Sequence, residues 1–226
     1  LFTLLAVYAT SMNFTILEIS IVTFLLAISG SLAQFPVGKI SDLYDRRKII
    51  IISTFGAAIF AILTIQASQQ MYMPDGLATS KTWFYIFFIL FSFCSLPMFS
   101  LILAYTNDYI PKENFVAAGA GLQFVFGLGA MSGPFLCSIF MNIVGSNGFF
   151  IFLFFFHSII GIFGIYRMKV RPTVDNPDSQ FVAMPQTITP AGIELNPTTE
   201  HIEEPYSEKV KEILERKGVK YRKEDD

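Results

Sequence analysis

Four residues between two long apolar runs have the types and the spacing of a charged switch. Gly38, Asp42, Arg46 and Arg47 follow one another as G-x-x-x-D-x-x-x-R-R within the stretch QFPVGKISDLYDRRKIIII. Gly38 lacks a Cβ, so another helix can approach it closely. The Asp42 carboxylate can accept hydrogen bonds from the free N–H groups that begin a neighbouring helix, and each arginine can pair bidentately with an acid. A plain charged loop that only sets membrane orientation is the alternative interpretation.

The chain around this stretch has the composition of an integral membrane protein. Apolar residues make up 53% of it, Phe alone contributes 25 residues, and charged residues only 15%, against about 25% in soluble domains. A helix that spans a bilayer needs about 20 apolar residues. The uncharged windows that supply them are 1–17, 19–38, 49–74, 82–107 and 114–166. We therefore expect an all-α membrane protein, and no nucleic-acid partner, because the basic residues mark loops and tail and not one face.

Six membrane-spanning helices are predicted, and they form one half-domain over residues 1–171. Their expected ranges are 1–13, 18–40, 47–67, 82–106, 114–143 and 147–167. The last uncharged window holds two helices, since VGSNG supplies a turn within it. The first span is too short, and LFTLLAVYAT has neither a Met nor a basic flank. We expect the chain to begin inside a helix of a longer protein.

Lys and Arg are distributed unevenly between the two sides of this half-domain. The connections after the even-numbered spans, with the tail, hold Lys39, Arg46, Arg47, Lys48, Lys112, Arg167, Lys169 and Arg171. The connections after the odd-numbered spans hold only Lys81. Cytoplasmic loops carry the excess of basic residues, so the first set is predicted to face the cytoplasm and the loop 66–82 to be external.

The composition changes at Pro172, and residues 172–226 are predicted to be a cytoplasmic tail. Repeated Pro, Thr and Asn without helical or strand periodicity indicate a mostly extended segment. A short helix over about 207–217 follows, with Ser207 as its N-cap and Gly218 at its end.

The charged stretch resembles the signature loop of the Major Facilitator Superfamily, whose pattern is G-x-L-a-D-[RK]-x-G-R-[RK]. Gly38, Asp42, Arg46 and Arg47 match it, whereas Leu43 and Asp45 depart from it. The variant QFPVGKISDLYDRR, the stretch LAYTNDYIPKENFVAAGAGLQFVFGLGAMSGPFL and the tail segment MPQTITPAGIELNP are similar to the YcaD-like branch of bacterial members. The resemblance implies helices seven to twelve of a twelve-helix fold, with the other six-helix half as a partner, and location in a bacterial inner membrane.

The resemblance also implies a latch at the cytoplasmic face. Asp42 is expected to reach the N-terminus of a helix in the other half, which stabilises the state closed to the cytoplasm. Arg46 is expected to be held by a second acid. Asp108 is the best candidate because it ends the fourth span on the same membrane face, and Glu113 is the alternative.

The stretch GLGAMSGPF in the fifth span combines small residues with a proline. Gly129 and Gly133 favour close helix packing, and Pro134 removes a backbone donor inside the span. The stretch is similar to the G-x-x-x-G-P pattern of the family. Packing with a kink is the favoured interpretation, and a role in coupling is the alternative.

Candidates for the substrate pathway are polar residues in the spans that the family arrangement turns toward the central cavity. These are Tyr8, Ser31, Gln34, Ser95 and Gln123. The two glutamines are the strongest, because an amide is costly to bury in lipid. Single serines in membrane helices usually bond to their own backbone. His157 is expected to make an interhelical hydrogen bond; proton relay is the alternative.

These observations predict half of a secondary transporter that moves a small organic solute by alternating access. A membrane enzyme would need a nucleophile–base pair or a metal cluster within its spans, and a channel would need a pore segment or charged ring; the sequence displays neither. A non-transporting, sensor-like member of the same fold stays open as a third alternative. No catalytic residue, cofactor or metal is predicted.

Overall fold

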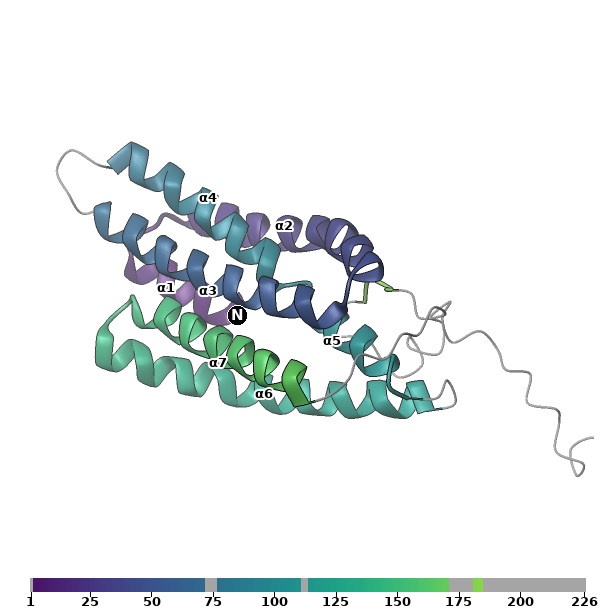
Figure 1. The fold of residues 1–226 in the computed structure, drawn as a ribbon. Coiled ribbons are helices and arrows are strands. Elements are labelled where there is room, and N and C mark those ends of the chain that lie inside the picture. Colours follow the sequence, from purple (N-terminus) through teal and green to yellow (C-terminus); the bar gives the residue numbers. More distant parts are fainter. Residues whose placement is uncertain (1, 72–76, 111–113, 171–180, 185–226) are drawn as a thin grey trace, which may run out of the picture.

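Helices account for the regular structure in the computed structural model, which describes residues 2–71, 77–110, 114–170 and 181–184 (Figure 1). They are α1 (Phe2–Ser11), α2 (Ile16–Leu43), α3 (Arg46–Gln70), α4 (Leu77–Ser95), α5 (Met98–Asn107), α6 (Phe115–Val144) and α7 (Gly148–Val170). Among the described residues, five helical segments are long and apolar enough to cross a membrane, with Lys81–Asn107 counted as one. The predicted all-α membrane bundle is confirmed. The expected tail helix at 207–217 lies outside the described residues.

The expected fourth span is divided in two by the structure. α4 ends at Ser95, and α5 begins at Met98 with Pro97 at its N-cap. Proline has no N–H to donate, so the helical hydrogen-bond ladder is interrupted here. Leu96, between the two helices, fills the space beside Gly30 of α2, where an added Cβ would overlap its side chain. The predicted fourth span is therefore present as one apolar segment, Lys81–Asn107, but it consists of two helices and not one.

The other boundaries agree with the expected spans to within about five residues, and the connections on either side of α3 are shorter than predicted. α2 begins with a capping box in which the Thr15 hydroxyl accepts from the Glu18 N–H and the Glu18 carboxylate accepts from the Thr15 N–H. α6 ends at Val144 and is followed by Gly145, whose φ of 79° lies in the left-handed region that glycine tolerates. The start of α2 and the end of α6 thus coincide with local capping signals as well as with the limits of the apolar runs.

The interior of the bundle is built around α3 and a cluster of aromatic rings. α3 packs against α4 on one side and α7 on the other, and α6 packs against α7 (Figure 1). Small residues such as Ala57 and Ala61 of α3 are fully buried, which lets its neighbours approach closely. The rings that fill the remaining space come from α1, α4 and α7: Tyr8, Phe84, Phe88, Phe91, Phe149 and Phe150.

Three helices, α2, α6 and α7, leave long apolar faces uncovered within the described chain. On α2 these residues form a stripe, called the α2 stripe below: Leu17, Ile21, Phe24, Ile28, Leu32 and Phe35. α6 is bare over most of its length, and only 6% of its most apolar window is buried. Added Cβ atoms at Gly129 and Gly133 would meet nothing within 4 Å. The close packing predicted for these glycines is therefore not made inside this half, and Pro134 lies within a continuous helix.

One end of the bundle contains the basic residues of α2, α3 and α7. This basic end contains Lys39, Arg46, Arg47, Lys48, Arg167 and Lys169, at the end of α2, the start of α3 and the end of α7. The C-terminus of α5 and the described segment 181–184 lie at the same end (Figure 1). The residues of the predicted switch and part of the predicted tail therefore lie at the same end of the bundle.

Candidate functional site

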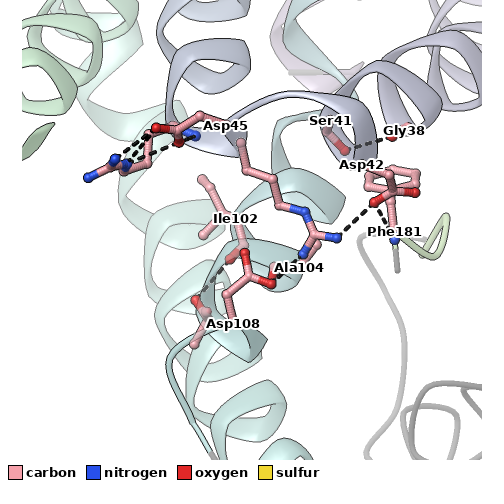
Figure 2. Close-up of polar contacts among 11 residues, drawn as sticks. Gly38, Ser41, Asp42, Asp45, Ile102, Ala104, Asp108 and Phe181 are labelled. Atoms are coloured by element: carbon pink, nitrogen blue, oxygen red, sulfur yellow. Dashed lines mark hydrogen bonds and ion pairs between the residues drawn. The ribbon is translucent and has the colours of Figure 1, made fainter. Parts of the chain in front are cut away.

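Arg46 joins the ends of three helices at the basic end. It begins α3, and its side chain is only 7% exposed. One terminal nitrogen, Nη1, donates to Asp108 Oδ1 at 2.6 Å and to the carbonyl of Ala104 at 3.1 Å. The other, Nη2, donates to Asp42 Oδ1 at 2.8 Å. Figure 2 shows the guanidinium bridging Asp42 of α2 and Asp108 after α5. We call this arrangement the Arg46 clamp.

The local sequence explains why the clamp forms. The short connection Tyr44–Asp45 places Arg46 four residues after Asp42. Asp108 is the C-cap of α5, where a carboxylate faces the negative end of the helix dipole and is disfavoured without a cation. The guanidinium provides that cation, and it also binds one of the last carbonyls of α5. The contact between Arg46 and Asp108 that the sequence predicted is present.

Arg47 makes a different, local pair. Its Nε and Nη2 atoms bind the two carboxylate oxygens of Asp45 at 3.0 and 2.7 Å. Asp45 is also the N-cap of α3 and accepts the Arg47 N–H at 3.0 Å. The hydrogen bond from the Arg47 side chain lowers the pKa of Asp45, against the opposing effect of burial. Asp45 departs from the family pattern. It caps α3 and holds the Arg47 side chain next to the start of that helix.

Asp42 has a second partner that the sequence did not predict. The backbone N–H of Phe181 donates to Asp42 Oδ1 at 2.8 Å (Figure 2). The Phe181 ring covers Gly38, where an added Cβ would overlap the ring. Within the described chain the space beside Gly38 is filled by a tail side chain, and the approach of a neighbouring helix at Gly38 stays a prediction. The signal that could have revealed this contact is the short apolar run FVAM within a Pro-, Thr- and Asn-rich tail.

Tyr8 and Ser95 lie inside the half and not along its bare faces. Tyr8 is fully buried, and its ring packs against Phe149 and Phe150. The Ser95 hydroxyl binds His157 Nε2 at 2.9 Å, while His157 Nδ1 contacts the Leu153 carbonyl at 2.8 Å. The interhelical hydrogen bond expected for His157 is confirmed. The Ser95 hydroxyl therefore has a partner inside the half, and a pathway role for Tyr8 and Ser95 stays a prediction.

The other three pathway candidates lie on the helices with bare faces. Ser31 of α2 is exposed, and its hydroxyl donates to the Ala27 carbonyl at 2.9 Å, as expected of a serine in a membrane helix. Gln34 of α2 and Gln123 of α6 are half-buried. Both glutamines therefore stay candidates for lining a pathway between this half and whatever covers α2 and α6.

The opposite end of the bundle has its own ion pair. Lys81 Nζ lies 2.6 Å from Glu18 Oε1, and the ammonium group lies 5.8 Å from the centre of the Phe14 ring. Glu18 already serves the capping box of α2. Glu18, the acid that the sequence places near a span on this side, is thereby neutralised by Lys81. Nowhere in the described ranges do three His, Cys, Asp or Glu side chains gather as they would around a metal ion.

The chain is similar in sequence to known membrane transporters. The family model of the Major Facilitator Superfamily matches residues 1–216. An uncharacterized MFS-type transporter, YfkF of Bacillus subtilis (strain 168), is 25% identical over 152 residues, which is 65% of this chain and 35% of that relative. The chain thus spans about a third of the length of the curated relative that it matches. No solved structure matches the chain. These matches identify the superfamily, and membership of the YcaD-like branch stays a prediction.

Proposed function

Because this chain belongs to the Major Facilitator Superfamily, we propose that it is one six-span half of a transporter that moves a small organic solute by alternating access. The observation that carries the proposal is the Arg46 clamp, which gathers the ends of α2, α3 and α5 around one buried guanidinium. A charged group held in this way lets three helices move as one body. Alternating access requires such rigid bodies on each side of the substrate.

The other half of the transporter is the proposed partner of the bare faces. The α2 stripe and most of α6 are apolar and exposed within the described chain, and the matching relative is about three times as long as the aligned part. The small residues Gly129 and Gly133 have open space around them, so helices of another half can approach α6 closely there. The surrounding lipid bilayer is the partner of the remaining surface.

Asp42 is proposed to latch the two halves together. It lies two helical turns beyond Phe35, so it continues the α2 stripe on the same face. A carboxylate at that place can accept hydrogen bonds from the start of a helix in the other half, and a partly buried contact of this kind contributes up to about 2 kcal/mol. This is enough to favour the closed state about 30-fold.

Uptake of solutes by cells or proteoliposomes containing the full-length protein tests the transport proposal. A panel of labelled small organic solutes should include at least one that the protein concentrates or equilibrates faster than vesicles without it. Family membership favours transport over the membrane enzyme and the channel subunit. Binding without any uptake would instead support the sensor-like alternative.

The glutamines on the bare helices give a sharper prediction about the pathway. The Gln34→Leu, Gln123→Leu double variant should lose most of the uptake, roughly tenfold or more, because each amide supplies hydrogen bonds that leucine cannot. Ser20→Ala is the matched control, since its hydroxyl donates to the Ile16 carbonyl of its own helix. Full transport by the double variant would remove both glutamines from the pathway.

The basic end is proposed to face the cytoplasm, with the tail on that side and the protein in a bacterial inner membrane. The asymmetry of Lys and Arg supports this orientation. Single cysteines at Leu43, which is exposed, and at Ser80 should react oppositely with an impermeant thiol reagent in intact cells. We expect labelling at Ser80→Cys and protection at Leu43→Cys. The reverse pattern would invert the topology.

A further inference from the structure

The described part of the tail is a short apolar segment bound at the basic end. Phe181 packs against a small cluster formed by Val37 of α2 and by Met98 and Leu101 of α5. Met184, three residues later, is only 5% exposed, whereas Ala183 between them is exposed. The segment 181–184, called the strap below, therefore has two inward-facing anchors and an outward-facing residue between them.

The backbone of the strap is recognised as well as its side chains. The Ser100 hydroxyl of α5 accepts from the Met184 N–H at 3.1 Å and donates to the Met184 carbonyl at 3.0 Å. At the other end, Asp42 accepts the Phe181 N–H. Asp42 of α2 and Ser100 of α5 thus bind three backbone groups of the strap, which are the N–H of Phe181 and the N–H and carbonyl of Met184.

The hydroxyl of Ser100 differs in its partners from those of two other buried serines, Ser41 and Ser92. The Ser41 hydroxyl donates to the Gly38 carbonyl and the Ser92 hydroxyl to the Phe88 carbonyl, each within its own helix. Ser100 is 1% exposed, and both of its hydrogen bonds go to the strap. Without the strap, this buried hydroxyl would have to find other partners. The break at Pro97 contributes, because it starts α5 immediately before Ser100.

We propose that the strap is a built-in conformational device, and that its binding to Gly38, Asp42 and Ser100 competes with the latching of Asp42 by the other half. Asp42 Oδ1 accepts from both Arg46 and Phe181, at the end of the α2 stripe where the other half would approach. A bound strap therefore favours the state open at the basic end, and a released strap favours the closed state. The competition rests on the proposed function, whereas binding of the strap does not.

Disulfide cross-linking in the full-length protein tests binding of the strap without any need for transport. In a background with the native cysteines replaced, Ser100→Cys with Met184→Cys should cross-link at least about tenfold faster than Ser100→Cys with Ala183→Cys. The adjacent Ala183 has the same tether but faces outward, so it controls for random encounters. Equal rates at the two positions would overturn the proposal.

The glycine under Phe181 provides a second test of the same geometry. Gly38→Ala should slow the Ser100–Met184 cross-link severalfold, because its methyl group overlaps the Phe181 ring. In a Phe181→Ala background the ring is absent, so adding Gly38→Ala should change the rate little further. If Gly38→Ala slows cross-linking equally in both backgrounds, the strap does not bind as proposed.

Thiol labelling tests the competition. We expect the Phe181→Ala, Met184→Ala variant, which keeps Asp42 and the clamp intact, to shift the protein toward the state closed at the basic end. A cysteine at Ser31, which is exposed on α2, should then be labelled severalfold more slowly from that side. Unchanged labelling would overturn the competition, while absence of uptake for every solute would count only against the proposed function.

Discussion

Two ion pairs of the same length lie at opposite ends of the bundle, and they differ in nearly everything else. Arg46 to Asp108 and Lys81 to Glu18 are both 2.6 Å contacts. The Arg46 and Asp108 side chains are 7% and 13% exposed, whereas those of Lys81 and Glu18 are 32% and 20% exposed. Arg46 also contacts Asp42 and an α5 carbonyl. Burial and shared partners, more than distance, decide what each pair contributes.

The difference has a physical cause. A partly exposed pair competes with water and salt, and it typically contributes 0 to about 1 kcal/mol. A buried pair contributes little net stability when it is intact, but removing one member leaves an uncompensated charge and costs about 3–5 kcal/mol. The basic end is therefore the more sensitive region to substitution, and the Lys81 end the more tolerant one.

The largest expected effect is that of Arg46→Ala. It leaves the Asp42 and Asp108 carboxylates without their shared cation, so we expect a loss of about 3 kcal/mol in the free energy of unfolding. Chemical denaturation in detergent would measure it. The Arg46→Ala, Asp108→Ala double variant should cost less than the sum of the single variants, since the two side chains act as a unit. Strict additivity would show that the clamp is not energetically coupled.

Asp42→Asn should have an intermediate effect, directed at conformation more than at folding. The asparagine carbonyl can still accept the Phe181 N–H, but the side chain has lost the charge that attracts a helix N-terminus. We expect a shift of up to about 2 kcal/mol, or about 30-fold, toward the state open at the basic end, with slower transport. Accessibility of cysteines at that end would report it, and an unchanged bias would reduce the stretch to an orientation signal.

Lys81→Ala should have the smallest effect, less than about 1 kcal/mol and smaller still in high salt. Glu18→Gln is the matched variant, because glutamine can complete the capping box of α2 while it removes the ion pair. The two variants should therefore have similar melting temperatures. A large loss for Lys81→Ala would contradict the contrast between the two ends.

The clamp was predictable from the sequence because few acids are available at the basic end. Hydropathy places the helix ends, the basic residues mark one side, and Asp108 ends a span on that side. Topology thereby reduced the expected partners of Arg46 to Asp108 and the alternative Glu113. The interhelical bond of His157 was predicted from its position in the middle of a span, although its partner, Ser95, was not identified.

The break in the fourth span was not predictable in the same way. Pro36, Pro97 and Pro134 all lie within apolar runs, yet only Pro97 interrupts a helix. A proline weakens a helix wherever it occurs, and the surroundings decide whether the helix divides. Next to Pro97, the Leu96 side chain packs against Gly30 of α2, and the Ser95 hydroxyl binds His157 of α7.

The sequence by itself determined the membrane class, the helix ends and the charged residues of the basic end, because hydrophobic length, capping and charge are local properties. Only the tertiary structure decided that Phe181 covers Gly38 and that Ser100 binds the Met184 backbone. These partners lie more than 80 residues apart in the chain. No periodicity in an irregular tail indicates which surface it meets; that depends on the shape and on the buried polar groups that α2 and α5 form only when they are packed together.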